Sequence, residues 1–156
     1  MLSLKQRFIV TLVVLAIPGF GAGEASAQDK DRIVTERQEA MKQQGREMVA
    51  VRNYFQDKGD QAAAIAALDS LQKSVPKVVD WFPAGTGIGE ATVKTRAKPE
   101  IWLEHDKFLA ADKTVIGQIA ALDAAVKSGD KPKVEAQFKE IAFCEGCHGA
   151  FRAKQE

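Results

Sequence analysis

Two cysteines and a histidine stand close together near the end of the chain, in the stretch FCEGCHGAFR. Cys144 and Cys147 are the only cysteines of the 156 residues, and His148 follows the second one directly. Residues three and four positions apart share one face of a helix, so on a helix these side chains would point the same way. Two thiols and an imidazole in one place could form a disulfide, a thiol redox site, a metal site or a haem-attachment site.

Three of these chemistries fit the spacing poorly. A disulfide between Cys144 and Cys147 would close a very small loop and stabilise the chain little. A thiol redox site normally opens a helix that follows a strand, and no strand pattern precedes this motif. A zinc ion would need a fourth ligand besides the three residues of the motif, and only the distant His105 is left to supply it.

Covalent haem uses every part of the motif. Two thiols separated by two residues add to the two vinyl groups of the porphyrin, and the adjoining histidine reaches the iron. We therefore expect one haem c, attached covalently through Cys144 and Cys147. His148 is then the proximal axial ligand of the iron.

The start of the chain has the pattern of an export signal. A basic beginning is followed by an uncharged apolar run at residues 8–17 and by the small residues ASA at 25–27. The apolar run is shorter than the roughly 20 residues that a helix needs to cross a bilayer. We expect residues 1–27 to be removed as a signal peptide and residues 28–156 to form one domain in the periplasm, with no membrane anchor.

The charges of the chain nearly balance, with 22 Lys and Arg against 21 Asp and Glu. Removal of Lys5, Arg7 and Glu24 with the signal would bring the net charge from +1 to zero. A neutral surface of mixed charge argues against nucleic acid as a partner. The composition leaves open whether the protein is a monomer or a homodimer.

Apolar residues recur at steps of three and four in four stretches, the pattern of one buried helix face. The four stretches are 31–57, 60–82, 99–128 and 132–151. Pro76 is expected to kink or split the second, because proline removes a backbone hydrogen bond. The segment 83–98 has three glycines and no helical period, which predicts a long crossover loop. Together these elements predict an all-α fold, an antiparallel four-helix bundle.

Two residues inside these stretches lead to further expectations. His105 falls in phase with the apolar residues of the third stretch, so we expect a hydrogen-bonded histidine in the core. Gly45 interrupts the first stretch at a cost of about 1 kcal/mol relative to alanine, so we expect another segment to approach it closely.

A four-helix chain that ends in CEGCHGAFR resembles the class II c-type cytochromes, the cytochrome c-prime family. RQEAM at 37–41, GREM at 45–48 and KPEIW at 98–102 also resemble motifs of that family. The likeness covers essentially all of the chain after the signal, and the haem motif is its most specific part. The resemblance implies a left-handed four-helix bundle with one covalent haem.

The family has two branches, which differ in the residue that faces the iron opposite the histidine. In the five-coordinate branch an apolar side chain stands there, and the iron is high-spin and binds nitric oxide or carbon monoxide. In the other branch a methionine binds the iron and gives a low-spin electron carrier. Counted four residues from Arg37, the position is Met41, which the resemblance implies is the distal axial ligand. From the residues alone Met48 is an equal candidate, and either methionine could simply fill the core.

Two arginines are expected near the cofactor. The resemblance implies that Arg37, one turn before Met41, contacts a haem propionate; a solvated helix charge is the alternative. Arg152, one turn after His148, could shape the field around the axial histidine or complement the helix dipole.

The sequence therefore predicts a periplasmic electron carrier with His/Met-ligated low-spin iron and unidentified redox partner proteins, and not an enzyme. The alternative is a five-coordinate, gas-binding haem protein of the same family. A weaker third possibility is a haem-free bundle that binds a partner and carries a Cys144–Cys147 disulfide.

Overall fold

The structure is a computed structural model, and it describes residues 26–141 and 145–154. The elements are α1 (Ala27–Phe55), α2 (Gln61–Ser74), the 3-10 helix η1 (Val75–Trp81), α3 (Glu100–Leu103), α4 (His105–Ser128), α5 (Lys131–Ile141) and α6 (Glu145–Phe151). Within these residues the only β-type pairing is an isolated antiparallel bridge between Ala97 and Arg152. The predicted all-α fold is confirmed.

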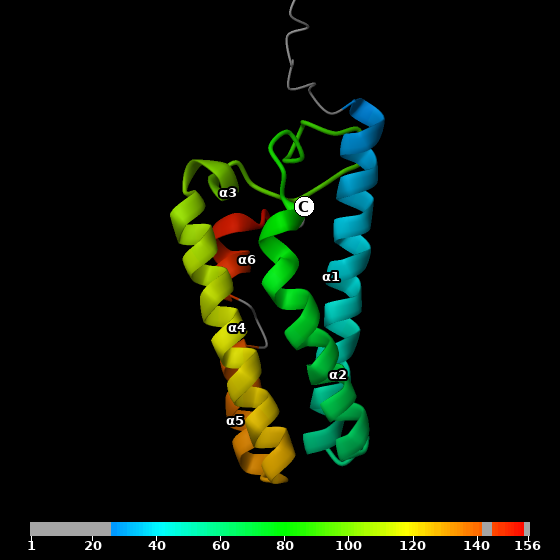
Figure 1. Cartoon of the computed structure of the whole chain (residues 1–156), viewed down its shortest axis with the longest axis vertical. Coiled ribbons are helices and arrows are strands. Elements are labelled where there is room, and N and C mark those ends of the chain that lie inside the picture. The colour runs from blue at the N-terminus through cyan, green and yellow to red at the C-terminus, as the bar shows by residue number, and fades with distance from the viewer. Residues whose placement is uncertain (1–25, 142–144, 155–156) are drawn as a thin grey trace, which may run out of the picture.

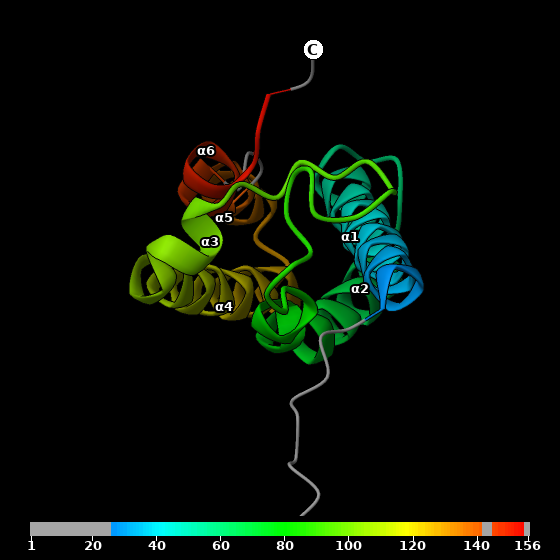
Figure 2. The ribbon, with the colours of Figure 1, turned by 90° about the horizontal axis from the view of Figure 1, so that it is seen from above.

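The helices form an up-and-down bundle (Figure 1). α1 packs against α2, α2 against α4, and α4 against α5, so neighbours in the sequence are neighbours in space. The segment 82–99 crosses over the upper end of the bundle between η1 and α3, as the view from above shows (Figure 2). The predicted four-helix bundle with one long crossover loop is thereby confirmed. No helix in the described parts of the chain is long and apolar enough to cross a membrane.

The helix ends follow local capping rules. The hydroxyl of Ser26 accepts a hydrogen bond from the backbone N–H of Asp29 at 3.2 Å and caps α1. The Asp60 carboxylate accepts from the N–H of Ala63 at 2.7 Å and caps α2. α4 ends at Ser128 and is capped by Gly129, whose φ of 76° lies in the left-handed region that glycine adopts without steric cost.

The chain departs from regular helix at two places near the upper end. α2 ends at Ser74 and continues as the 3-10 helix with Pro76 in its first turn, as the proline predicts. The third stretch, expected as one helix, is broken at Glu104, where φ of −118° and ψ of 45° are not helical. The break takes His105 out of phase with the core, and its side chain is exposed. The expectation of a core histidine is therefore wrong.

Gly45 does not mark a close approach. A Cβ built on this residue would meet no atom of another segment within 4 Å, and the residue is exposed. The expectation for Gly45 is wrong, because the residue lies on the exposed side of α1.

The buried apolar residues form two clusters at different heights of the bundle. The lower cluster joins α1, α2, α4 and α5, and its fully buried members are Val51, Ala64, Leu68, Leu122, Ala125, Val126 and Val134. The upper cluster consists of Ala97, Ile101, Phe108 and Phe151, with Val78, Val79, Phe82, Trp102 and Ala111 partly buried against it. The ring of Phe108 lies 5.3 Å from that of Phe82 and 5.2 Å from that of Phe151, both edge to face.

Candidate haem-attachment site

The cysteine–histidine motif lies beside the upper cluster. Cys147 and His148 are adjacent and half-buried on α6, a helix of seven residues. The buried ring of Phe151 anchors this helix against Phe108 of α4. Cys144 lies outside the described residues. The structure thus places two of the three motif residues on one short helix whose far end is fixed in the core.

The crossover loop holds the end of α6. Ala97 and Arg152 form the isolated antiparallel bridge, and the N–H of Lys98 donates to the carbonyl of Phe151 at 3.0 Å. The ammonium of Lys98 also donates to the carbonyl of Ala150 at 2.8 Å. These bonds satisfy carbonyls that the end of a helix leaves unpaired. The position of the motif therefore depends on a segment some fifty residues earlier in the chain.

The surroundings of His148 favour its uncharged form. Burial of the imidazole, and secondarily the positive charge of Arg96, lower the pKa of His148 below its usual value. A neutral imidazole has a free lone pair for a metal ion. A thiol and an imidazole at adjacent, half-buried positions of a short helix are donor types that haem c requires, so the described residues of the site fit the cofactor.

The zinc alternative gains no support. His105 is exposed on α4, and no group of three or more His, Cys, Asp or Glu in the described ranges could hold a metal ion.

Arg37 is buried, with 4% of its surface exposed. Its guanidinium donates to the carbonyl of Trp81 at 3.1 Å, to the hydroxyl and carbonyl of Thr86 at 3.0 and 2.9 Å, and to the hydroxyl of Thr95 at 3.0 Å. It also lies 4.3 Å from the centre of the Phe82 ring. Burial lowers the pKa of Arg37 to about 10, so it keeps its charge at neutral pH. Arg37 is not a solvated helix charge.

Two more side chains of α1 hold the crossover loop. The Asp31 carboxylate accepts from the N–H groups of Thr92 and Val93, at 2.7 and 3.0 Å, and from the Thr92 hydroxyl. These bonds, the one from the hydroxyl first, lower the pKa of Asp31. The amide of Gln38 donates to the carbonyl of Lys94 at 2.8 Å. Sequence analysis missed these contacts, because a threonine in a loop shows no period that would reveal its partner.

The two methionines of α1 have different surroundings. Met48 packs against the lower cluster and fills space there. Met41 is half-buried, one turn after Arg37, and packs against neither cluster among the described residues. The two methionines of this helix thus lie in different surroundings.

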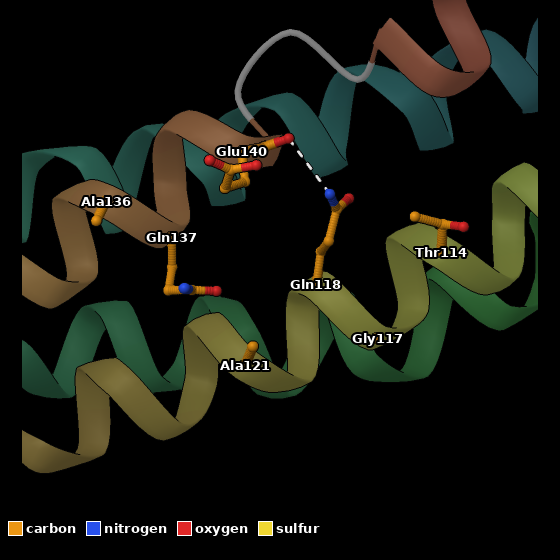
Figure 3. Close-up of a pocket in the computed structure, with 7 residues that line it drawn as sticks. All are labelled: Thr114, Gly117, Gln118, Ala121, Ala136, Gln137 and Glu140. Carbon is orange, nitrogen blue, oxygen red and sulfur yellow. Dashed lines mark hydrogen bonds between the residues drawn. The ribbon is translucent and has the colours of Figure 1, made fainter.

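A shallow surface pocket lies elsewhere, between α4 and α5 (Figure 3). Its lining residues are Thr114, Gly117, Gln118, Ala121, Ala136, Gln137 and Glu140. The amide of Gln118 reaches across it to the carbonyl of Glu140 at 3.4 Å. None of the candidate site residues lines this pocket.

Known proteins resemble this chain along most of its length. The family described as Cytochrome C' matches residues 32–152. A cytochrome c' of Alcaligenes xylosoxydans xylosoxydans is 35% identical over 95 residues, which are 60% of this chain and 71% of the relative. A cytochrome c' of Rubrivivax gelatinosus is 35% identical over 94 residues, which are 60% of this chain and 69% of the relative.

Solved structures share the fold. The cytochrome c' of Rubrivivax gelatinosus has a TM-score of 0.68 at 26% identity, covering 80% of this chain and 97% of that one. A nitric oxide complex of a point mutant of the Alcaligenes xylosoxidans protein has a TM-score of 0.69 at 26% identity, covering 81% and 97%. A cytochrome c' with a ligand-controlled dimer dissociation has a TM-score of 0.73 at 22% identity, covering 85% and 100%, which shows the fold alone.

These relatives correct the predicted function. The sequence favoured a His/Met-ligated, low-spin electron carrier, but the relatives from four bacteria all bear the name of the five-coordinate, gas-binding branch. The prediction of a low-spin electron carrier is wrong, and the gas-binding alternative is the one supported. The prediction rested on a single methionine, and a methionine on a buried helix face more often fills space than binds a metal.

Proposed function

The chain belongs to the cytochrome c' family, and on that premise we propose that it binds a small diatomic gas, nitric oxide or carbon monoxide, at a five-coordinate haem iron. The family binds one covalently attached haem c, and its members are haem proteins rather than classical enzymes. When bound, the haem supplies an iron whose sixth position is open to a gas. This proposal rests on the similarity in sequence and fold to the cytochromes c'. One of these proteins was solved as a nitric oxide complex.

Three residues would hold the haem. Cys144 and Cys147 would form the thioether bonds to the haem, and His148 would bind its iron. The half-buried, adjacent side chains of Cys147 and His148 support this assignment. The lowered pKa of His148 supports it as well, since burial favours the uncharged imidazole that can bind a metal.

Met41 faces the open side of the iron in this proposal. Its side chain is half-buried one turn after Arg37 and packs in neither cluster of described residues. The thioether then limits the space beside the sixth position without bonding to the iron. A gas molecule would have to displace this side chain. Methionine is unbranched and flexible, so it can move aside more readily than most side chains.

Arg37 would contact a haem propionate. Its buried guanidinium forms no ion pair with any carboxylate in the described segments, and its hydrogen bonds go to carbonyl and hydroxyl oxygens. These partners are neutral, so the buried charge has no opposite charge beside it, and a propionate would supply one.

Visible absorption spectra test the proposal directly. The purified protein should show a high-spin, five-coordinate spectrum in both oxidation states, and the reduced form should bind carbon monoxide and nitric oxide. Acid-acetone extraction should leave the haem on the protein. A low-spin spectrum that carbon monoxide does not change would refute the proposal.

Proteins of this family are periplasmic, and we propose that residues 1–27 direct export and are removed. The match to the family begins after them, at residue 32. Cleavage after Ala27 would also remove Ser26, the cap of α1, so the first turn should fray in the mature protein. Mass spectrometry of the protein recovered from the periplasm should give a chain that begins at Gln28.

Whether that chain is a monomer or a homodimer can be measured by sedimentation, with and without carbon monoxide.

A further inference from the structure

We propose that Trp102 of α3 is a positioning residue for Arg37, because it holds the turn of the crossover loop that accepts hydrogen bonds from this arginine. The inference rests on the proposed function, in which Arg37 contacts a haem propionate. In the sequence Trp102 is the last residue of the KPEIW stretch, and no spacing connects it with Arg37 of the first helix. The link between the two side chains is visible only in the folded chain.

The crossover loop occupies most of the donors of Arg37. One terminal nitrogen of the guanidinium donates to the carbonyl of Trp81 and to the hydroxyl of Thr86. The other donates to the carbonyl of Thr86 and to the hydroxyl of Thr95. Arginine has five N–H donors, so the Nε–H is left, and it has no acceptor among the described residues. The loop therefore sets the orientation of the guanidinium and leaves one donor for a propionate oxygen.

Trp102 holds the turn 82–87 at both of its ends. The indole N–H donates to the carbonyl of Phe82 at 2.9 Å. The ring lies against Gly87, since a Cβ added to this glycine would come within 2.8 Å of a ring carbon. Thr86, which accepts two hydrogen bonds from Arg37, lies between these two contacts.

The turn is closed on itself, so a shift at one end is passed to the other. The hydroxyl of Thr86 donates to the carbonyl of Pro83 at 2.8 Å, and Thr86 is 1% exposed. The ring of Phe82 in turn contacts the guanidinium of Arg37. A displacement at Phe82 or at Gly87 must therefore move the acceptors of Arg37.

A cation held beside the haem favours ferrous over ferric iron. The ferric state carries one more positive charge, so the guanidinium of Arg37 repels it more strongly. Because Trp102 acts by holding Arg37 in place, loss of its N–H should lower the reduction potential only while Arg37 is present. A general loosening of the loop would lower the potential by admitting water, and it would do so with or without Arg37.

Reduction potentials of the haem-loaded protein test the inference in a double-mutant cycle. Spectroelectrochemical titration would compare the wild type with Arg37→Gln, Trp102→Phe and the double variant. Each single change should lower the midpoint potential, and the double variant should have the potential of Arg37→Gln. Additive shifts, or a Trp102→Phe potential equal to that of the wild type, would overturn the inference.

The matched control is Leu103→Ala, at the next residue of α3. Leu103 is 81% exposed, so this change should leave the potential as in the wild type. A shift as large as that of Trp102→Phe would overturn the inference, because it would show that any change in α3 acts on the haem.

A second variant keeps the test independent of Arg37→Gln, which removes a buried side chain. Gly87→Ala retains Arg37 and Trp102, but its methyl group must displace the ring of Trp102, so the potential should fall as in Trp102→Phe. A normally loaded Gly87→Ala protein with the wild-type potential would overturn the inference. The absorption spectrum separates the two proposals: a wild type without five-coordinate haem refutes the proposed function, whereas a normal spectrum with additive shifts refutes only the role of Trp102.

Discussion

The two ends of the bundle are stabilised in different ways. At the lower end aliphatic side chains from four helices, such as Leu68, Leu122 and Val134, are completely buried. At the upper end four apolar residues are buried, and the aromatic rings of Phe82 and Trp102 that pack against them are only partly buried. There a buried arginine of α1 also forms hydrogen bonds with the crossover loop. The lower end can form from the protein alone. The upper end lacks a comparable apolar core, and in our proposal the haem supplies that apolar surface.

The largest effect is expected at the axial histidine. His148→Ala removes the proposed proximal ligand, so we expect loss of the five-coordinate spectrum and of carbon monoxide binding. His105→Ala is the matched control, because this histidine is exposed on α4 and should leave both unchanged. Absorption spectra of the reduced proteins, with and without carbon monoxide, provide the measurement. Equal losses in the two variants would mean that His148 is not the specific ligand of the iron.

A large effect on stability without an effect on the spectrum is expected at the lower end. Leu122→Ala removes a fully buried side chain and leaves a cavity, which costs about 2–5 kcal/mol of unfolding free energy. Urea denaturation followed by circular dichroism would measure the loss, and the haem spectrum should stay as in the wild type. A change in the haem spectrum of Leu122→Ala would show that packing in the lower cluster affects the haem site at the upper end.

Sequence analysis predicted the lower end better than the upper. Helix periodicity is local, so the helices around Leu122 and the haem motif could be found from spacing alone. The partners of Arg37 could not, because Thr86 and Thr95 lie 49 and 58 residues away in a segment without a period. The break at Glu104 was missed for a related reason, since apolar residues continue in phase across it and only its backbone shows the change.

Arg37 allows a direct test of the polar contacts at the upper end. Arg37→Lys keeps the charge but cannot form the bonds of the guanidinium to Thr86 and Thr95 together, and should cost about 1–3 kcal/mol. Trypsin should then cut the loop 83–98 faster than in the wild type.

The control is Arg32→Lys on the same helix. Arg32 is 59% exposed and paired with Glu36 on the surface, so this change should cost no more than about 0.5 kcal/mol. If both variants lose equal stability, the loop is not held by Arg37.

The smallest effect is expected for Asp31, and it depends on pH. Hydrogen bonds from Thr92 and Val93 lower the pKa of Asp31 in the folded protein relative to the unfolded chain. The sign follows from linkage: the stabilisation is complete above the unfolded pKa, near 4, and is lost as the pH falls through the lower folded value. The stability difference between Asp31→Asn and the wild type should therefore become smaller as the pH falls from about 5 to about 2. Over this range the wild type loses the same charge by protonation. Thermal unfolding midpoints across this range would measure the difference, which should be small because the carboxylate lies near solvent. A difference that grows as the pH falls would mean that the carboxylate does not hold the crossover loop through its charge.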